Sequence, residues 1–255
     1  MTNTLYQSIK LEIISIKERW LSYFLFFISP VIIIYIFFIA ATSIVNWGVF
    51  AGLNLTIFDY LGDNIIGIVI LFLSTQMVVL RIVGERSPYG TLDRELIAIP
   101  RISMYFGKLI TNFVFVVLQI FFIYIFAFQI LQIKNYANPI HLILFYVLLG
   151  LFGLVSGLAI SIFSDSKEQA IQTVPFFIIT LLILSGIIIP IDQMAASLKN
   201  VVSFLPLTAV LSALLKLRLS GLGFEDVFKE LITISGWIII ILIIGLSKFL
   251  LEKRK

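Results

Sequence analysis

The chain has 255 residues, of which 60% are hydrophobic and only 13% are charged. Soluble domains carry roughly 25% charged residues, so a water-soluble fold is excluded and most of the apolar surface must face lipid. The formal net charge of +4 comes from basic residues scattered around apolar segments, which does not indicate nucleic-acid binding. The composition therefore predicts an all-α integral membrane protein.

Residues 1–20 predict an amphipathic helix that lies in the cytoplasmic membrane interface. Lys10 and Lys17 share one side of this helix with Gln7. Apolar residues recur at helical spacing away from them: Leu5, Ile9, Ile13, Ile16 and Trp20. The segment either anchors the chain in the membrane or contacts a partner, and both interpretations remain open.

Residues 21–255 predict a six-span transmembrane domain, because a helix needs about 20 predominantly apolar residues to cross a bilayer. Six segments qualify: 21–45, 65–83, 105–131, 141–163, 173–189 and 231–250. Thirteen of the 18 Lys and Arg residues flank these spans on one side, which includes both termini. Since basic residues stay inside, both termini are expected in the cytoplasm and the protein in the cell membrane.

The predicted spans contain almost no charged side chains, whereas ion-coupled carriers usually place such groups near mid-bilayer. Arg81 lies near the cytoplasmic end of the second span, where its long side chain is expected to reach the lipid headgroups. This pattern argues against coupling to protons or sodium ions.

The cytoplasmic loop after the second span predicts a short amphipathic helix. Gly90 permits a turn, and Thr91 can serve as the N-cap of the helix. Asp93 and Glu95 follow in the first turn, where acidic side chains complement the helix dipole. One apolar face follows, made of Leu92, Leu96 and Ile99, and Pro100 ends the helix. So short a helix is marginal alone in water. Either the protein's own helix ends or a soluble partner should therefore cover this face.

The fourth span carries small residues at every fourth position, Gly153, Gly157 and Ser161. Such a stripe lets helices approach closely, and packing within the subunit is favoured over a dimer contact. The string Gly153 to Gly157 also raises the possibility of a serine nucleophile at Ser156 in an intramembrane hydrolase. The only histidine, His141, starts the same helix and lies roughly 22 Å away, so no catalytic pair forms. No catalytic residue is expected.

The 190–230 segment is too apolar for a free loop, and Pro206 interrupts it. It predicts two short helices that fold against the outer membrane face or dip partly into the bilayer. With no cysteine and one histidine, the chain also offers no thiolate or multi-histidine metal site.

Two motifs resemble those of membrane subunits of type 2 ATP-binding-cassette (ABC) exporters. Arg86 to Pro100, followed by Gly107-Lys108-Leu109, is similar to the family's loop helix and the opening of its third span. The end of span 5, Leu184 to Pro190, and the later Leu205 to Thr208 are similar to a second family element. Ser87-Pro88-Tyr89 and Ala195 depart from the pattern. The spacing most resembles the drug-resistance and small-amphiphile branch.

This resemblance implies that the loop helix docks on a separate cytoplasmic ATPase, present in two copies. The chain lacks a phosphate-cradling G-x-x-x-x-G-K-[ST] loop, so ATP and Mg would bind the partner and no cofactor would bind here. The implied contact residues are Arg86, Thr91, Leu92, Asp93, Arg94, Glu95, Leu96 and Ile99.

The resemblance further implies a permease subunit that moves a hydrophobic or amphipathic, drug-like or lipid-like substrate outward. Two permease subunits, as a homodimer or a heterodimer, would face each other around a path lined by spans 2 and 5. The expected lining residues are Thr75, Gln76, Phe176, Phe177, Thr180 and Ser185, although hydrogen bonding between helices explains each equally well. The alternative is a six-span channel or scaffold without ATP coupling.

Overall fold

A computed structural model describes residues 2–18, 20–43, 57–85, 99–187, 191 and 194–251. All regular structure in this part of the chain is helical, and six helices are long and apolar enough to cross a membrane. They are α2 (Trp20–Ser43), α3 (Ile57–Glu85), α5 (Arg101–Tyr124), α6 (Pro139–Phe163), α7 (Lys167–Leu184) and α10 (Phe228–Leu251). The predicted all-α fold with six spans is confirmed.

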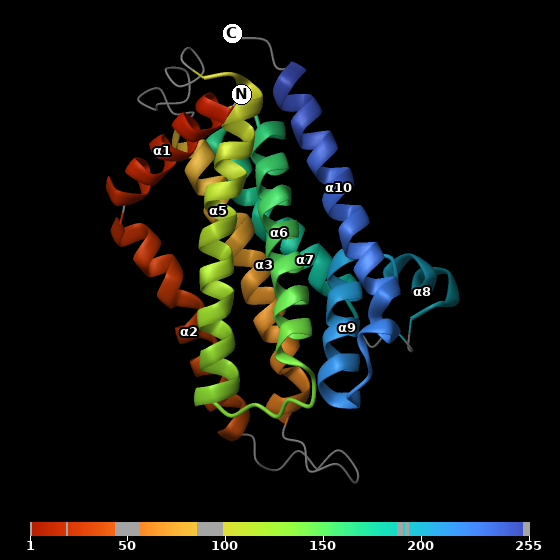
Figure 1. Ribbon diagram of the computed structural model, residues 1–255. Helices are drawn as coiled ribbons and strands as arrows, with labels where there is room; N and C mark the ends of the chain where they lie inside the picture. Colours follow the sequence, from red (N-terminus) through yellow and green to blue (C-terminus); the bar gives the residue numbers. More distant parts are fainter. Residues whose placement is uncertain are drawn as a thin grey trace.

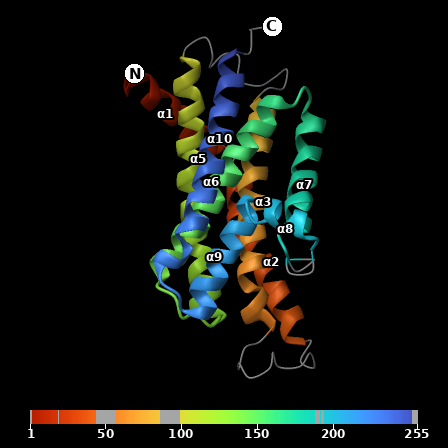
Figure 2. The same ribbon diagram turned by 90° about the vertical axis from the view of Figure 1, so that its right-hand side faces the viewer.

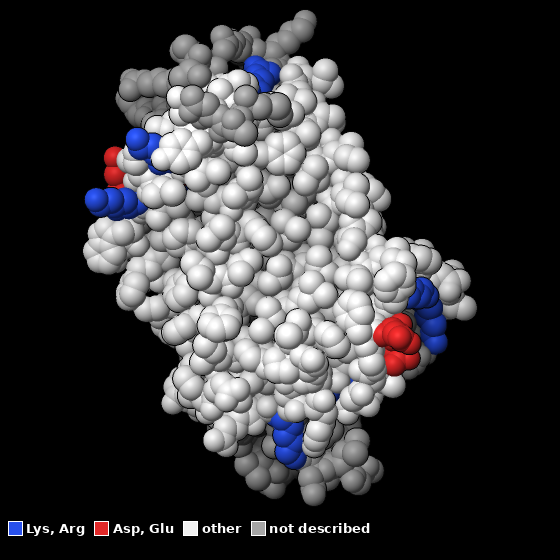
Figure 3. Space-filling view, viewed as in Figure 1, with Lys and Arg blue, Asp and Glu red and all other residues white. Residues whose placement is uncertain are grey.

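The six helices form an upright bundle in which α3 and α6 occupy the centre (Figure 1). α2, α7 and α10 lie at the periphery and leave most of their surface exposed (Figures 1 and 2). The start of α1 (Thr2–Glu18) and the end of α10 lie at the same end of the bundle. On the face in Figure 3, an uncharged region separates the charged side chains near the end that carries the termini from those beside α8 and at the opposite end. A bundle that crosses a bilayer needs such a region.

Two helices begin six or more residues before the apolar segments predicted for them. α7 starts at Lys167, because the Ser166 hydroxyl caps it by accepting a hydrogen bond of 3.1 Å from the Gln169 N–H. α3 starts at Ile57, so Asp63 lies within the helix rather than before it. Hydropathy marks where a helix is apolar, whereas capping and backbone hydrogen bonds decide where it begins.

Between α7 and α10 the chain forms two helices, α8 (Ala196–Val202) and α9 (Pro206–Ser220), bent by 84° relative to each other. α9 runs along the half of the bundle away from the termini (Figures 1 and 2). It packs closely there: a Cβ on Gly67 of α3 would lie 3.0 Å from Leu211 of α9 and 3.4 Å from Leu149 of α6. α9 is thus part of the core of the bundle.

Candidate functional site

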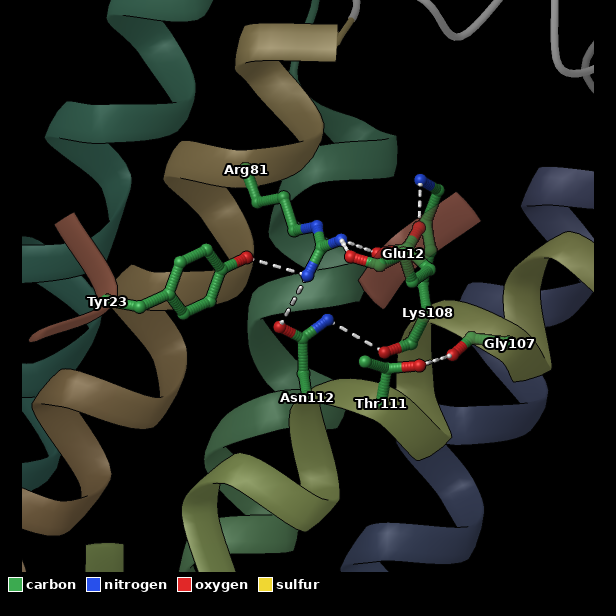
Figure 4. A network of polar contacts seen from close by, with 7 residues as sticks. All are labelled: Glu12, Tyr23, Arg81, Gly107, Lys108, Thr111 and Asn112. Carbon is green, nitrogen blue, oxygen red and sulfur yellow. Dashed lines mark hydrogen bonds and ion pairs between the residues drawn. The ribbon is translucent and has the colours of Figure 1, made fainter. Parts of the chain in front are cut away.

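A buried carboxylate joins the N-terminal helix to two spans. Glu12 of α1 is 3% exposed and lies between Arg81 of α3 and Lys108 of α5 (Figure 4). Its Oε1 lies 2.8 Å from the Lys108 Nζ, and its Oε2 pairs with the Arg81 guanidinium. Both cations are also buried, so one anion is held between two cations inside the protein.

The Arg81 guanidinium extends this network to α2. Its Nη1 donates hydrogen bonds to the Tyr23 hydroxyl at 2.7 Å and to the Asn112 Oδ1 at 3.3 Å, and Nη2 donates to the Glu12 backbone carbonyl at 3.2 Å. Asn112 in turn donates to the Lys108 carbonyl at 2.7 Å. Residues of α1, α2, α3 and α5 therefore share one buried network, which favours a single arrangement of these helix ends.

Gly107 allows α1 to approach α5 closely. A Cβ on Gly107 would lie 2.2 Å from the Ser8 Oγ, a distance that real side chains do not reach. Nearby, the Thr4 and Ser103 hydroxyls are hydrogen-bonded at 3.0 Å. Two consecutive residues of α5 therefore hold α1 in place. Gly107 leaves space for α1, and Lys108 pairs with Glu12.

The prediction that Arg81 reaches the lipid headgroups is wrong. Arg81 is 4% exposed, and its guanidinium is satisfied inside the protein by Glu12, Tyr23 and Asn112. Burying a charge is costly unless it is paired and hydrogen-bonded. A carboxylate from a separate helix meets that condition here, and the sequence gives no sign of it near Arg81.

A second buried ion pair lies toward the other end of α3. Arg218 of α9 and Asp63 are at most 1% exposed, and the Arg218 Nε donates to the Asp63 Oδ2 at 2.5 Å. The Tyr146 hydroxyl of α6 donates to the other Asp63 oxygen at 2.7 Å, and the Arg218 Nη1 donates to the Lys134 carbonyl at 2.8 Å. Asp63 lies two residues before the predicted second span, 65–83, but inside the longer helix α3 that the structure shows.

The small residues of α6 lie against α3. A Cβ on Gly153 would lie 2.0 Å from the Ser74 Oγ, and one on Gly157 would lie 2.6 Å from the Thr75 carbonyl oxygen. Ser161 is buried and donates a hydrogen bond of 2.8 Å to the Gly157 carbonyl of its own helix. α3 and α6 thus approach to backbone contact within one subunit.

Residues 50–247, most of the chain, match the family described as ABC-2 family transporter protein. The chain belongs to this family. Among curated proteins, none matches the chain. The family assignment makes the protein the multi-pass, non-catalytic permease subunit of an ABC transporter, and such permeases pair with ABC ATPase subunits. The permease domain of this family binds no cofactor.

Most residues expected to contact the ATPase of this ABC-2 transporter lie outside the described residues: Arg86, Thr91, Leu92, Asp93, Arg94, Glu95 and Leu96. Ile99 is described, is 4% exposed and packs against Met104 of α5. Arg101, at the start of α5, donates hydrogen bonds of 3.4 and 3.3 Å to the Phe249 and Leu250 carbonyls of α10. The start of α5 is thereby tied to the end of the last span.

The residues expected to line the transport path fall into two groups. Thr75 and Ser185 are buried, and each donates to a carbonyl of its own helix, at 2.7 and 2.8 Å. Gln76 is half-buried, as is Phe177, whose ring lies 6.3 Å from that of Phe152. Phe176 and Thr180 are exposed on α7. Of this set, the structure brings only the last two together on an open surface.

The sequence predictions missed Glu12, Lys108, Asp63 and Arg218. One signal for Glu12 was available, since Ser8, Glu12 and Ser15 recur at helical spacing on one side of α1. Lys108 is part of the Gly-Lys-Leu motif, but its partner is 96 residues away. Asp63 and Arg218 are 155 residues apart, and no local pattern connects them.

Proposed function

We propose that this ABC-2 permease exports a hydrophobic or amphipathic substrate, driven by two copies of a separate ATPase and completed by a second permease subunit. The observation that carries the proposal is the exposed face of α7. Polar and aromatic side chains follow one another on that face at helical spacing: Gln169, Gln172, Phe176 and Thr180. These residues lie in a helix whose composition suits a membrane span.

Such a face is poorly suited to lipid alone. An amide side chain in hydrocarbon without a hydrogen-bond partner is costly, and polar groups in spans normally point to other helices or to water. An open groove at the start of this face is lined by Glu168, Gln172, Thr173 and Phe176, among others. The Thr173 and Thr180 hydroxyls donate to carbonyls of their own helix at 2.8 Å. A second subunit across a shared path would cover this face and offer a hydrogen-bond partner to the exposed Gln172 amide.

The chemistry of this face suits an amphiphile. Beyond Glu168, its polar groups are the neutral amides and hydroxyls of Gln169, Gln172, Thr173 and Thr180. Its exposed apolar side chains are Phe176, Ile179 and Ile183. Neutral donors and acceptors beside an aromatic surface bind molecules that have both polar and apolar parts. A drug-like or lipid-like substrate fits this surface better than a sugar chain or an ion does.

The orientation follows from charge and from α1. Lys10 and Lys17 are exposed on α1, as are the apolar side chains of Tyr6 and Ile13, and Trp20 is exposed at the start of α2. A helix with this arrangement lies in a membrane interface. Together with the excess of basic residues, it supports cytoplasmic termini. The 86–99 segment, between α3 and α5, would then face the cytoplasm and contact the ATPase.

The test is to isolate the complex in mild detergent and compare it with the Leu96→Asp variant. We expect an ATPase subunit to co-purify with the wild-type chain and to be lost from the variant, while the variant still inserts in the membrane. ATP-dependent uptake of fluorescent amphiphiles into inside-out vesicles should disappear with it. Leu198→Asp, an exposed leucine of α8, is the matched control and should retain both.

Unchanged uptake in Leu96→Asp would refute ATPase docking at this segment. Recovery of the wild-type chain alone, under conditions that preserve other transporter complexes, would instead favour a channel or scaffold.

A further inference from the structure

We propose that Glu12 is a positioning residue for energy coupling: it makes α1 and the adjacent ends of α3 and α5 move as one unit when the ATPase acts. This inference rests on the proposed ATP-driven function and assigns a role in it to the N-terminal helix. It is carried by the two cations that Glu12 joins and by the close packing of α1 on α5.

The two cations belong to the two spans between which the ATPase-contact segment lies in the sequence. Arg81 stands in the last turns of α3, before residue 86, and Lys108 stands in the second turn of α5, after residue 99. A single carboxylate contacts both. A force on the intervening segment that moves either helix end must therefore also move α1 or break a buried ion pair.

Breaking this contact is costly because the three charged side chains are shielded from solvent. Glu12, Arg81 and Lys108 are each at most 4% exposed. Without the carboxylate, two buried cations would remain near each other with less compensation, which raises the energy of the arrangement. The helix ends would then separate or admit water, and a displacement of α3 would no longer carry α5 and α1 with it.

α1 packs closely on α5 around Glu12. Ser8, four residues before Glu12, packs against Gly107 in the space that a Cβ at position 107 would occupy. Four residues further back, the Thr4 hydroxyl is hydrogen-bonded to that of Ser103. Three successive turns of α1 thus contact α5. Such an interface transmits displacement as a rigid contact does.

The experiment uses the full permease–ATPase complex in lipid nanodiscs. The chain has no cysteine, so Thr180→Cys on the exposed face of α7 supplies one reporter thiol. Its reaction rate with a maleimide is measured without nucleotide and with ATP plus vanadate, and ATP hydrolysis is measured in parallel. In the otherwise wild-type complex the rate should depend on nucleotide. In Glu12→Gln this dependence should fall about tenfold, while the complex stays assembled and hydrolyses ATP.

Glu18→Gln is the matched control, because Glu18 is an exposed acid of the same helix. It should behave as wild type. If Glu12→Gln does not assemble, Gly107→Ala tests the same contact without changing charge, since the added Cβ meets Ser8. Its control is Gly236→Ala, where nothing lies within 4 Å. We expect Gly107→Ala to lose the nucleotide dependence and Gly236→Ala to keep it.

A rescue separates positioning from general stability. Thr4→Cys and Ser103→Cys, oxidised to a disulfide before labelling, should restore the nucleotide dependence in Glu12→Gln by holding α1 on α5. Wild-type dependence in both Glu12→Gln and Gly107→Ala would overturn this inference alone. If the maleimide reaction rate of the reporter in the otherwise wild-type complex does not depend on nucleotide, the ATP-driven function and this inference are both overturned.

Discussion

Arg218 of α9 donates a hydrogen bond of 2.5 Å to Asp63 of α3, although the two residues are 155 positions apart in the chain. Arg81 of the same α3 helix pairs with Glu12 of α1. The two anchoring residues of α3 lie about 27 Å apart along the helix. The most buried span is therefore fixed at one end to the N-terminal helix and at the other to α9.

The Asp63–Arg218 pair should be important for folding. Asp63→Asn leaves the Arg218 guanidinium buried without its anion, and breaking a buried pair in this way costs about 3–5 kcal/mol. We expect a large drop in the unfolding temperature of the detergent-purified protein. Glu225 is an exposed acidic residue shortly after α9, so Glu225→Gln should leave the unfolding temperature unchanged. If Asp63→Asn melts like wild type, this pair does not hold α9 in place.

Gln119 of α5 compensates for a proline in α2. Pro30 has no N–H, which leaves the Phe26 carbonyl without its usual helical donor, and the Gln119 Nε2 donates to that carbonyl at 2.6 Å. Gln119→Leu should lower the free energy of unfolding by about 0.5–2 kcal/mol. Pro30→Ala should recover part of this loss, because alanine restores the N–H. A double-mutant cycle in thermal unfolding measures the coupling between Gln119 and Pro30. Gln129 is exposed, so Gln129→Leu is the control. Purely additive effects of the two changes would contradict the compensation.

The contact between α6 and α3 should respond differently at its two glycines. A Cβ at Gly157 meets the Thr75 carbonyl and Cα at 2.6 and 3.2 Å, so the backbones must move apart. We expect Gly157→Ala to destabilise the protein by about 1–3 kcal/mol. At Gly153 the nearest atom is the Ser74 hydroxyl, so Ser74→Ala should partly rescue Gly153→Ala. Equal tolerance of alanine at positions 157 and 236 in a melting assay would show that the helices are not this close.

The exposed ring of Phe176 should affect transport rather than stability. It is 74% exposed on α7, so its removal costs little packing, but a path residue would lose contact with an amphiphile. We expect Phe176→Ala to reduce vesicle uptake at limiting substrate by about tenfold. Ile239→Ala, on the exposed surface of α10, should not change uptake. An identical effect of both changes would mean that Phe176 faces lipid.

The fold class and the spans could be predicted because a bilayer imposes a local rule. About 20 apolar residues in a row are enough to recognise a span, and all six predicted segments correspond to helices. The stripe of Gly153 and Gly157 was also visible, since helical periodicity alone places both on one side of α6. The boundaries were less accurate where a cap such as Ser166 extends a helix into polar sequence.

The burial of these charges could not be predicted from the sequence. A charged residue near the end of a span is expected to contact lipid headgroups unless its partner in the protein is known. Arg81 and Glu12 are 69 positions apart and Lys108 and Glu12 are 96 apart. Whether such a side chain faces lipid or protein depends on how helices distant in sequence pack together. The sequence by itself determined that six helices of the described part of the chain are long and apolar enough to cross a membrane. Only the tertiary structure decided that α3 is anchored at both ends, because the low dielectric of the interior makes each buried charge dependent on one particular partner.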